Sequence, residues 1–192
     1  MALIIVGGQA KNVGKTTLIC NIISVFPDLQ WTAVKVSNHH HITENCEVLN
    51  EGPGWRILQQ NRGADHSDTA RFLKSGATRA LLVQADNHSL EEACVSLMQA
   101  IPAETAVIVE SASAAEFLKH DLLLLLLDSE QSDFKSSAAE QLDRADAFVI
   151  RDSDSGVGQG VHGSRGKPVL RAFPNQLDPA LFRMLETRLG NF

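Results

Sequence analysis

A lysine followed by two threonines stands near the start of the chain, between glycines and an apolar run. Positions 7–17 read Gly-Gly-Gln-Ala-Lys-Asn-Val-Gly-Lys-Thr-Thr. The apolar residues 2–6 precede this stretch and predict a short buried strand, and the mostly apolar residues 18–23 predict a helix. A strand, a glycine loop and Gly-Lys-Thr opening a helix together form a phosphate-binding loop, or P-loop. The motif predicts binding of a nucleoside triphosphate with Mg²⁺.

The residue types of this loop explain how it would hold phosphate. Backbone N–H groups point inward as an anion nest, and the helix N-terminus adds the positive end of its dipole. Lys15 should reach the β- and γ-phosphates, Thr16 should place its hydroxyl on magnesium, and Gly14 lets the backbone approach closely. The predicted nucleotide-binding residues of the loop are Gly8, Asn12, Val13, Gly14, Lys15, Thr16 and Thr17.

The loop departs from the usual motif at its first glycine. The usual spacing places a glycine at position 9, where this chain has Gln9, and Gly8 stands one position early. A glycine turn before an ordinary helix is the alternative interpretation, but the strand, loop and helix together favour the P-loop.

Acidic residues end three predicted strands, and one of them is expected to help bind the metal. Glu110 follows the apolar residues 107–109, so its carboxylate should face the phosphates and hold magnesium directly or through water. Asp86 and Asp128 end two other apolar strands and could serve in the same way, or each acid could lie in solvent. Thr16 and Glu110 are the predicted metal ligands.

Three adjacent histidines, residues 39–41, follow the second predicted strand, and Cys46 lies nearby. Imidazole and thiolate bind transition metals, but adjacent side chains diverge, so at most two of these histidines would usually meet on one ion. Contact with phosphate or with a second substrate, or a solvated loop, are the other interpretations. His39 and His40 are therefore included among the predicted cofactor-binding residues.

Lys35 is unusual because a strand buried in a parallel sheet rarely carries lysine. Its ammonium could reach the phosphates or an anionic substrate, or extend to the rim of the sheet, and Lys35 is included among the cofactor-binding residues. Asp68 and Arg71 are three positions apart and could form a surface ion pair on one helix face. The alternative places Arg71 on a ligand.

The overall composition excludes several classes of function. The chain has 192 residues, and its 23 acidic and 17 basic residues give a net charge of −6. This charge argues against nonspecific binding of nucleic acid or of an anionic membrane. Three cysteines without a CxxC pair suit a reducing cytosol, so a cytoplasmic location is expected. The longest apolar run, 122–127, is too short to span a bilayer.

The hydrophobic pattern predicts strands that alternate with helices. Strands are expected at 2–6, 31–36, 79–84, 105–109, 122–127, 147–150 and 169–172. Helices are expected after the P-loop and at 68–74, 89–100, 136–145 and 178–190, with Ser89 and Glu92 as a capping box. This alternation predicts an α/β fold, the three-layer P-loop NTPase fold, with a mostly parallel central sheet of about seven strands. One nucleotide-binding domain is expected over 1–192.

Two polar segments are predicted to be loops. Residues 37–66 are rich in His, Asn and Gly and predict a long loop or small excursion that carries function. Residues 152–167 contain five glycines and predict a flexible loop that could close as a lid.

Several of these segments resemble the molybdopterin-guanine dinucleotide biosynthesis protein B family, MobB. Residues 14–18 resemble its P-loop, and residues 35–40 look like its Lys-His-x-His-His segment, with one residue more and no histidine directly after the lysine. Residues 68–77 are similar to its Asp-Ser-x-x…Ala-Gly-Ala helix, and Val-Glu-Ser at 109–111 stands where the family has Val-Glu-Gly. The resemblance covers about residues 1–127.

The resemblance implies a P-loop fold, often dimeric, that binds GTP and assists the attachment of GMP to molybdopterin. Carried over, the functional positions are Lys15, Thr16, Glu110 and residues 39–40. It implies GTP (or ATP) with Mg²⁺ as cofactors, a protein of the molybdopterin pathway as partner, and a homodimer. Selectivity for guanine rests on the resemblance alone, because the chain has no Asn-Lys-x-Asp motif.

Two other functions compete with a GTP-binding accessory factor of weak hydrolytic activity. The first is an ATP-dependent small-molecule kinase or ligase, in which residues 37–66 would hold the acceptor and Lys35 would steady the transferring phosphoryl group. The second is a nucleotide-gated metal chaperone, which would use the histidines and Cys46.

Overall fold

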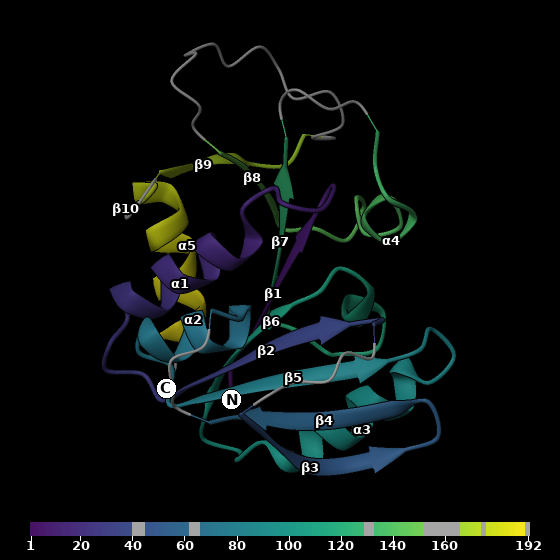
Figure 1. Ribbon diagram of the computed structural model, residues 1–192. Coiled ribbons are helices and arrows are strands. Elements are labelled where there is room, and N and C mark those ends of the chain that lie inside the picture. The colour runs from purple at the N-terminus through teal and green to yellow at the C-terminus, as the bar shows by residue number, and fades with distance from the viewer. Residues whose placement is uncertain (40–44, 62–65, 129–132, 152–165, 174–175, 191–192) are drawn as a thin grey trace.

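Within the residues that the structure describes, the sheet at the centre of the molecule has ten strands. Figure 1 shows how they are arranged. The computed structural model describes residues 1–39, 45–61, 66–128, 133–151, 166–173 and 176–190. The strands lie in the order β10-β9-β8-β7-β1-β6-β2-β5-β4-β3. Their bounds are β1 Leu3–Gly8, β2 Trp31–Ser37, β3 Cys46–Gly52, β4 Trp55–Gln60, β5 Arg79–Ala85, β6 Ala106–Glu110, β7 Leu122–Leu127, β8 Ala147–Arg151, β9 Val169–Phe173 and β10 Gln176–Leu177.

Seven neighbouring strands, from β9 to β5 in this order, are parallel. They correspond to the seven strands predicted from the sequence, and the predicted α/β fold with a mostly parallel sheet is confirmed. The predicted number of strands is wrong, because β10, β4 and β3 extend the two edges of the sheet with antiparallel pairs.

The β3–β4 hairpin lies within the segment predicted as a long loop. Most of β3 is exposed, whereas β4 buries Trp55, Ile57, Leu58 and Gln60. An edge hairpin of this kind has one solvated face and a solvated edge, so it needs few apolar residues and its composition is that of a loop. Residues 46–60 are therefore not a loop but form the other alternative, a small excursion from the central sheet.

Helices cover both faces of the sheet (Figure 1). On one face lie α1 Lys15–Val25, α2 Asp68–Lys74 and α5 Pro179–Leu189, and on the other lie α3 Leu90–Ala100 and the 3₁₀ helix η1 Ser113–Glu116. The short α4, Ser136–Ala139, gives way to turns where the sequence predicts a longer helix. In the described part of the chain, no helix is long and apolar enough to cross a bilayer.

The all-leucine strand β7 shows how the sheet separates two apolar cores. Leu122, Leu124 and Leu126 belong to the core beneath α1 and α5, and Leu123, Leu125 and Leu127 belong to the core beneath α3. All six side chains are buried, which explains why the strand has no polar alternation.

The strand order reverses at β1, which lies between β6 and β7. The chain leaves β1 through α1 to reach β2 on the β6 side, and after β6 it passes to β7 on the other side of β1. In open α/β sheets, ligands bind beyond the carboxyl ends of the strands at such a reversal. The loop after β1 is therefore where the fold places a binding crevice.

Candidate functional site

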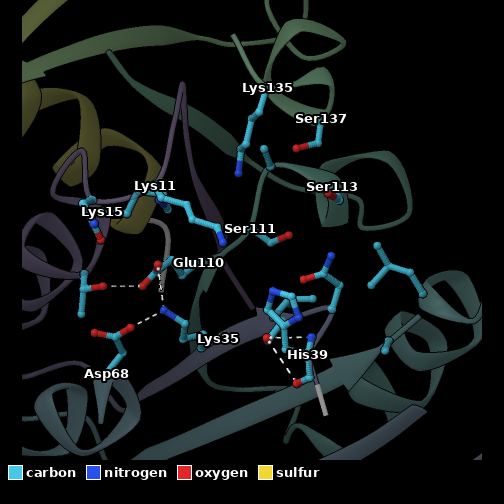
Figure 2. A pocket seen from close by; sticks show the side chains of 18 of the residues that line it. Lys11, Lys15, Lys35, His39, Asp68, Glu110, Ser111, Ser113, Lys135 and Ser137 are labelled. Carbon is cyan, nitrogen blue, oxygen red and sulfur yellow. Dashed lines mark hydrogen bonds and ion pairs between the residues drawn. The ribbon is translucent and has the colours of Figure 1, made fainter. Parts of the chain in front are cut away.

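A cavity of about 680 Å³ lies at the carboxyl ends of β1, β2 and β6 (Figure 2). Its walls come from the P-loop and the start of α1, from the ends of β2, β5 and β6, from α2, and from the start of α4. This volume is within the range of cofactor and substrate pockets. Segments far apart in the sequence thus meet at the position expected from the strand order.

The P-loop turns tightly from the end of β1 into α1. Gly14 has φ 100° and Asn12 has φ 62°, both in the left-handed region. A Cβ on Gly8 would lie 2.7 Å from Val13 Cγ2 and 2.9 Å from Lys15 Cδ, so the loop folds directly over this glycine. Among the described residues, no side chain caps the N-terminus of α1, which leaves its first N–H groups directed at the cavity.

Thr16 and Glu110 are brought together across the crevice. The Thr16 hydroxyl donates to Glu110 Oε2 at 2.8 Å, and the Glu110 side chain is only 6% exposed. The sheet register fixes this geometry, because Glu110 pairs with Val6 on one side and with Lys35 on the other. A hydroxyl and a carboxylate are hard oxygen donors, so this pair could hold Mg²⁺ next to a phosphate.

Lys35 lies between two carboxylates at the edge of the cavity. Its ammonium is ion-paired with Asp68 and, at 3.2 Å, with Glu110 Oε1. Burial alone would lower the pKa of Lys35, but Glu110 and Asp68 outweigh it and raise that pKa above its ordinary value. Burial alone would raise the pKa of Asp68, but Lys35, together with Thr16 and Arg71, lowers it. The predicted contact of Lys35 with phosphate thus competes with two carboxylates.

Replacing Lys35 with methionine should destabilise the fold by about 2 kcal/mol at neutral pH. The change leaves the buried Glu110 without its ammonium. Breaking a fully buried pair costs on the order of 3–5 kcal/mol, and the loss is smaller here because the Lys35 side chain is 26% exposed. Urea unfolding of this variant measures the loss of stability. Lys119→Met, which changes an exposed lysine, is the control. A Lys35→Met variant as stable as wild type would contradict the prediction.

The pKa shifts of Lys35 and Asp68 define the pH range in which their ion pair stabilises the fold. The raised pKa of Lys35 means that its contribution is lost as the pH rises through that pKa, above 10.5. The lowered pKa of Asp68 means that its contribution is lost as the pH falls through that pKa, below 3.8. The network therefore stabilises the fold fully at neutral pH.

The structure also places Arg71, which the sequence leaves between an ion pair and a ligand contact. Its guanidinium lies 3.5 Å from Asp68 Oδ1 and donates to Thr17 Oγ1 at 3.2 Å. The predicted pair with Asp68 is present, and Arg71 also lines the cavity. The alternative metal acids, Asp86 and Asp128, are not among the residues that line it.

The histidine segment is only partly described. His39 lines the cavity, whereas His40 and His41 lie outside the described residues. Cys46 donates through Sγ to Gln60 Oε1 at 3.5 Å, at the start of β3. Within the described ranges, no group of three His, Cys, Asp or Glu side chains could hold a metal ion. The Gly-rich segment also falls almost wholly outside the description.

Several lining residues were not predicted from the sequence. They are Lys11, Asn87, Ser111, Ser113, Lys135 and Ser137. Lys11 stands inside the P-loop motif, so its position already pointed to the site. Lys135 follows a polar stretch without a motif, and only the folded chain brings it to the cavity.

Solved structures with the same architecture establish the class of fold. HypB from Helicobacter pylori in complex with nickel aligns over 100% of this chain and 89% of its own, with 16% identity and a TM-score of 0.59. LpxK from Aquifex aeolicus in complex with ATP aligns over 99% of this chain and 68% of its own, with 14% identity and a TM-score of 0.55. These likenesses show the fold of P-loop NTPases.

No such comparison identifies a family. MobB from Bacillus subtilis aligns over 98% of this chain and 97% of its own with 16% identity. Its TM-score of 0.43 is too low to show a shared fold. No protein-family model and no curated protein sequence matches the chain. The fold is thus established at the level of the P-loop class.

Proposed function

We propose that this chain binds a nucleoside triphosphate with Mg²⁺ in the cavity beyond β1. The main support is a hydrogen bond between two residues of the site. Thr16, which directly follows the P-loop lysine, donates its hydroxyl to the carboxylate of the buried Glu110. Thr16 and Glu110 would hold the metal, which would supply positive charge to neutralise the phosphates. Lys15 would reach the same two phosphates, and the N-terminus of α1 would face them.

The charged groups of the site support cleavage of the terminal phosphoryl group. In hydrolysis, the oxygen of a water molecule would attack the γ-phosphorus while the bond to the β–γ bridging oxygen breaks. The nucleoside diphosphate would leave with that electron pair, and the proton of the water would pass to the phosphate products or to solvent. Asp68 is a weak base for this step, because its ion pair with Lys35 favours the charged carboxylate. Catalysis would therefore rest on positioning and charge neutralisation, which predicts slow hydrolysis by the chain alone.

Slow hydrolysis suits a GTP-binding accessory factor, and we assign this chain that role in the assembly of the molybdopterin guanine dinucleotide cofactor. The preference for GTP, the pathway and a homodimeric state are supported by the sequence resemblance in residues 1–127. The whole chain would act as a single nucleotide-binding domain, with a molybdopterin-pathway protein as partner.

A small-molecule kinase or ligase is the second candidate, and one feature of the cavity favours it. Past Lys35 the wall continues through Ser37 and His39. Ser111 and Ser113 line the cavity after β6 (Figure 2). Hydroxyl and imidazole groups there could hold a phosphoryl acceptor next to the terminal phosphate. ATP would then be the expected nucleotide.

Calorimetric titration with non-hydrolysable GTP and ATP analogues, each with and without Mg²⁺, tests the proposal. We expect binding that requires Mg²⁺ and that is tighter for the GTP analogue. Preference for ATP, followed by strong stimulation of turnover by one metabolite, would favour the kinase. Failure of both analogues to bind would overturn the nucleotide site, and equal affinities would count against the GTP-dependent role.

A further inference from the structure

Gln9, which stands where the P-loop motif usually has glycine, ties the loop to the segment after β7. The residue is 2% exposed. Its backbone N–H donates to Leu126 O at 2.8 Å, and its carbonyl accepts from the Lys135 N–H at 3.1 Å. Its side-chain amide donates to Asp133 O at 3.2 Å and accepts from the Asp128 N–H at 2.9 Å. A glycine could make none of the side-chain bonds.

These bonds fix the backbone that carries Lys135. The Lys135 side chain lines the cavity, and Figure 2 shows Lys135 and Lys11 reaching toward its middle from different walls. Lys135 enters from the side opposite Lys35 and Asp68 (Figure 2). The P-loop and Lys135 are therefore positioned by one residue, although they are more than a hundred positions apart.

The lysines of the cavity differ in their ion pairs with acidic side chains. Lys35 is ion-paired with both Asp68 and Glu110. Lys15 donates to the Ala10 carbonyl at 3.3 Å, and among the described residues no carboxylate lies within ion-pair distance of Lys11, Lys15 or Lys135. Three ammonium groups thus face one cavity in a chain whose net charge is −6. Such a cluster matches a ligand with several negative charges.

The surroundings of Lys135 indicate which part of that ligand it meets. Partial desolvation in the cavity lowers the pKa of Lys135, and Lys15 and Lys11 lower it further against the attraction of Glu110. Lys135 thus lines the same cavity as the P-loop lysine and the acid bonded to Thr16, and it senses the charge of both. On the proposed function, the terminal phosphate lies between these groups.

We propose that Lys135 binds the terminal phosphate of the nucleotide from the β7 side of the cavity, and that Gln9 is the positioning residue that holds it there. The inference rests on the proposed nucleotide site. In phosphoryl transfer, a cation supplied from outside the P-loop neutralises charge on the transferring group. This chain would supply that cation itself, as an ammonium close to Lys15.

The test compares triphosphate and diphosphate affinities in Lys135→Ala, Lys135→Arg and wild type. GTP and ATP analogues and the matching diphosphates serve as probes. A lost charged contact to the terminal phosphate should raise the triphosphate Kd about 10-fold while the diphosphate Kd changes less than about twofold. Lys135→Arg keeps the cation and should keep most of the triphosphate preference. Lys119→Ala, which removes an exposed lysine outside the cavity, should change neither Kd.

A double variant tests whether Gln9 acts through Lys135. Gln9→Ala should lower the triphosphate preference in the same direction, and the double variant Gln9→Ala/Lys135→Ala should lose no more than Lys135→Ala. If Gln9→Ala does not fold, Gln9→Glu keeps the acceptor for the Asp128 N–H and removes the donor to Asp133 O. Additive losses would overturn the positioning role of Gln9.

The outcomes separate this inference from the proposed function. Wild-type protein that binds no nucleotide removes the site and the inference together. Tight wild-type binding with an unchanged preference in Lys135→Ala leaves the site intact and overturns the inference. Equal losses of triphosphate and diphosphate affinity would also overturn it, because Lys135 would then not act at the terminal phosphate.

Discussion

Replacing Lys15 with alanine should weaken the binding of a nucleoside triphosphate analogue by about 100-fold or more. Hydrogen bonds to charged groups contribute on the order of 1.5–3 kcal/mol each, and a P-loop lysine contacts two phosphates. Lys15 already lies over the loop, with its Nζ 3.3 Å from Ala10 O. Calorimetry with the preferred triphosphate analogue and Mg²⁺ measures the loss.

The same change should leave the fold intact. Burial lowers the pKa of Lys15, and the attraction of Glu110 does not restore it, so the folded chain disfavours this charge. The charged form therefore weakens the fold slightly at neutral pH, and wild type should gain stability relative to Lys15→Ala as the pH rises through the lowered pKa toward 10.5. Urea unfolding at two pH values tests this sign.

Two matched variants make the result on Lys15 decisive. Lys15→Met keeps most of the aliphatic stem that packs on Gly8 and should lose affinity like the alanine variant, because the charge is what binds phosphate. Lys119→Ala removes a lysine on the surface and should bind like wild type. Unchanged affinity in folded Lys15→Ala would mean that the P-loop interpretation is wrong.

Replacing Glu110 with glutamine should uncouple nucleotide binding from Mg²⁺. Wild-type affinity is expected to rise strongly on adding Mg²⁺, and this gain should shrink about 10- to 100-fold in the variant, the usual range when a residue that supports a metal site is lost. Glutamine keeps the shape and one oxygen, but it removes the charge that faces Thr16 and Lys35. Titrations with and without Mg²⁺ give the ratio directly.

Asp86→Asn is the matched control for Glu110→Gln. Asp86 also follows a buried parallel strand, so the sequence alone gives it a similar pattern, but it does not line the cavity. Its variant should keep the full gain from Mg²⁺. A Glu110→Gln protein with the wild-type gain would show that the metal is held by other groups.

The parallel strands could be predicted because each is an apolar run between polar segments. Leu122–Leu127 is the plainest case, since both of its faces are buried. The β3–β4 hairpin could not be predicted, because its burial depends on where it packs. The predicted capping box at Ser89 is wrong for the same reason: its hydroxyl donates to Pro53 O at 2.9 Å, in the turn of that hairpin, and makes no cap bond.

In the candidate site, too, some residues could be predicted from the sequence and others could not. Lys15, Thr16 and Glu110 could be named from the sequence because a motif and the end of an apolar strand fix their positions locally. Lys135 could not, because its place depends on hydrogen bonds to Gln9, which is 126 positions away. The sequence shows Gln9 only as a departure from a motif, and its contacts depend on the folded chain.

All six residues of β7 are leucine, so its sequence does not define how the strand aligns with its neighbours. Sliding β7 by one position would exchange its two faces and still bury leucine on both, so its side chains cannot select the native register. The selection falls to polar neighbours: the Asp121 carboxylate accepts from the Leu3 N–H at 2.9 Å, and the Asp146 carboxylate accepts from the Leu123 N–H at 2.7 Å. These bonds support the register in which Leu126 accepts from the Gln9 N–H and Gln9 accepts from the Lys135 N–H. Two acids at the amino ends of parallel strands thus contribute to the geometry at the carboxyl ends of those strands.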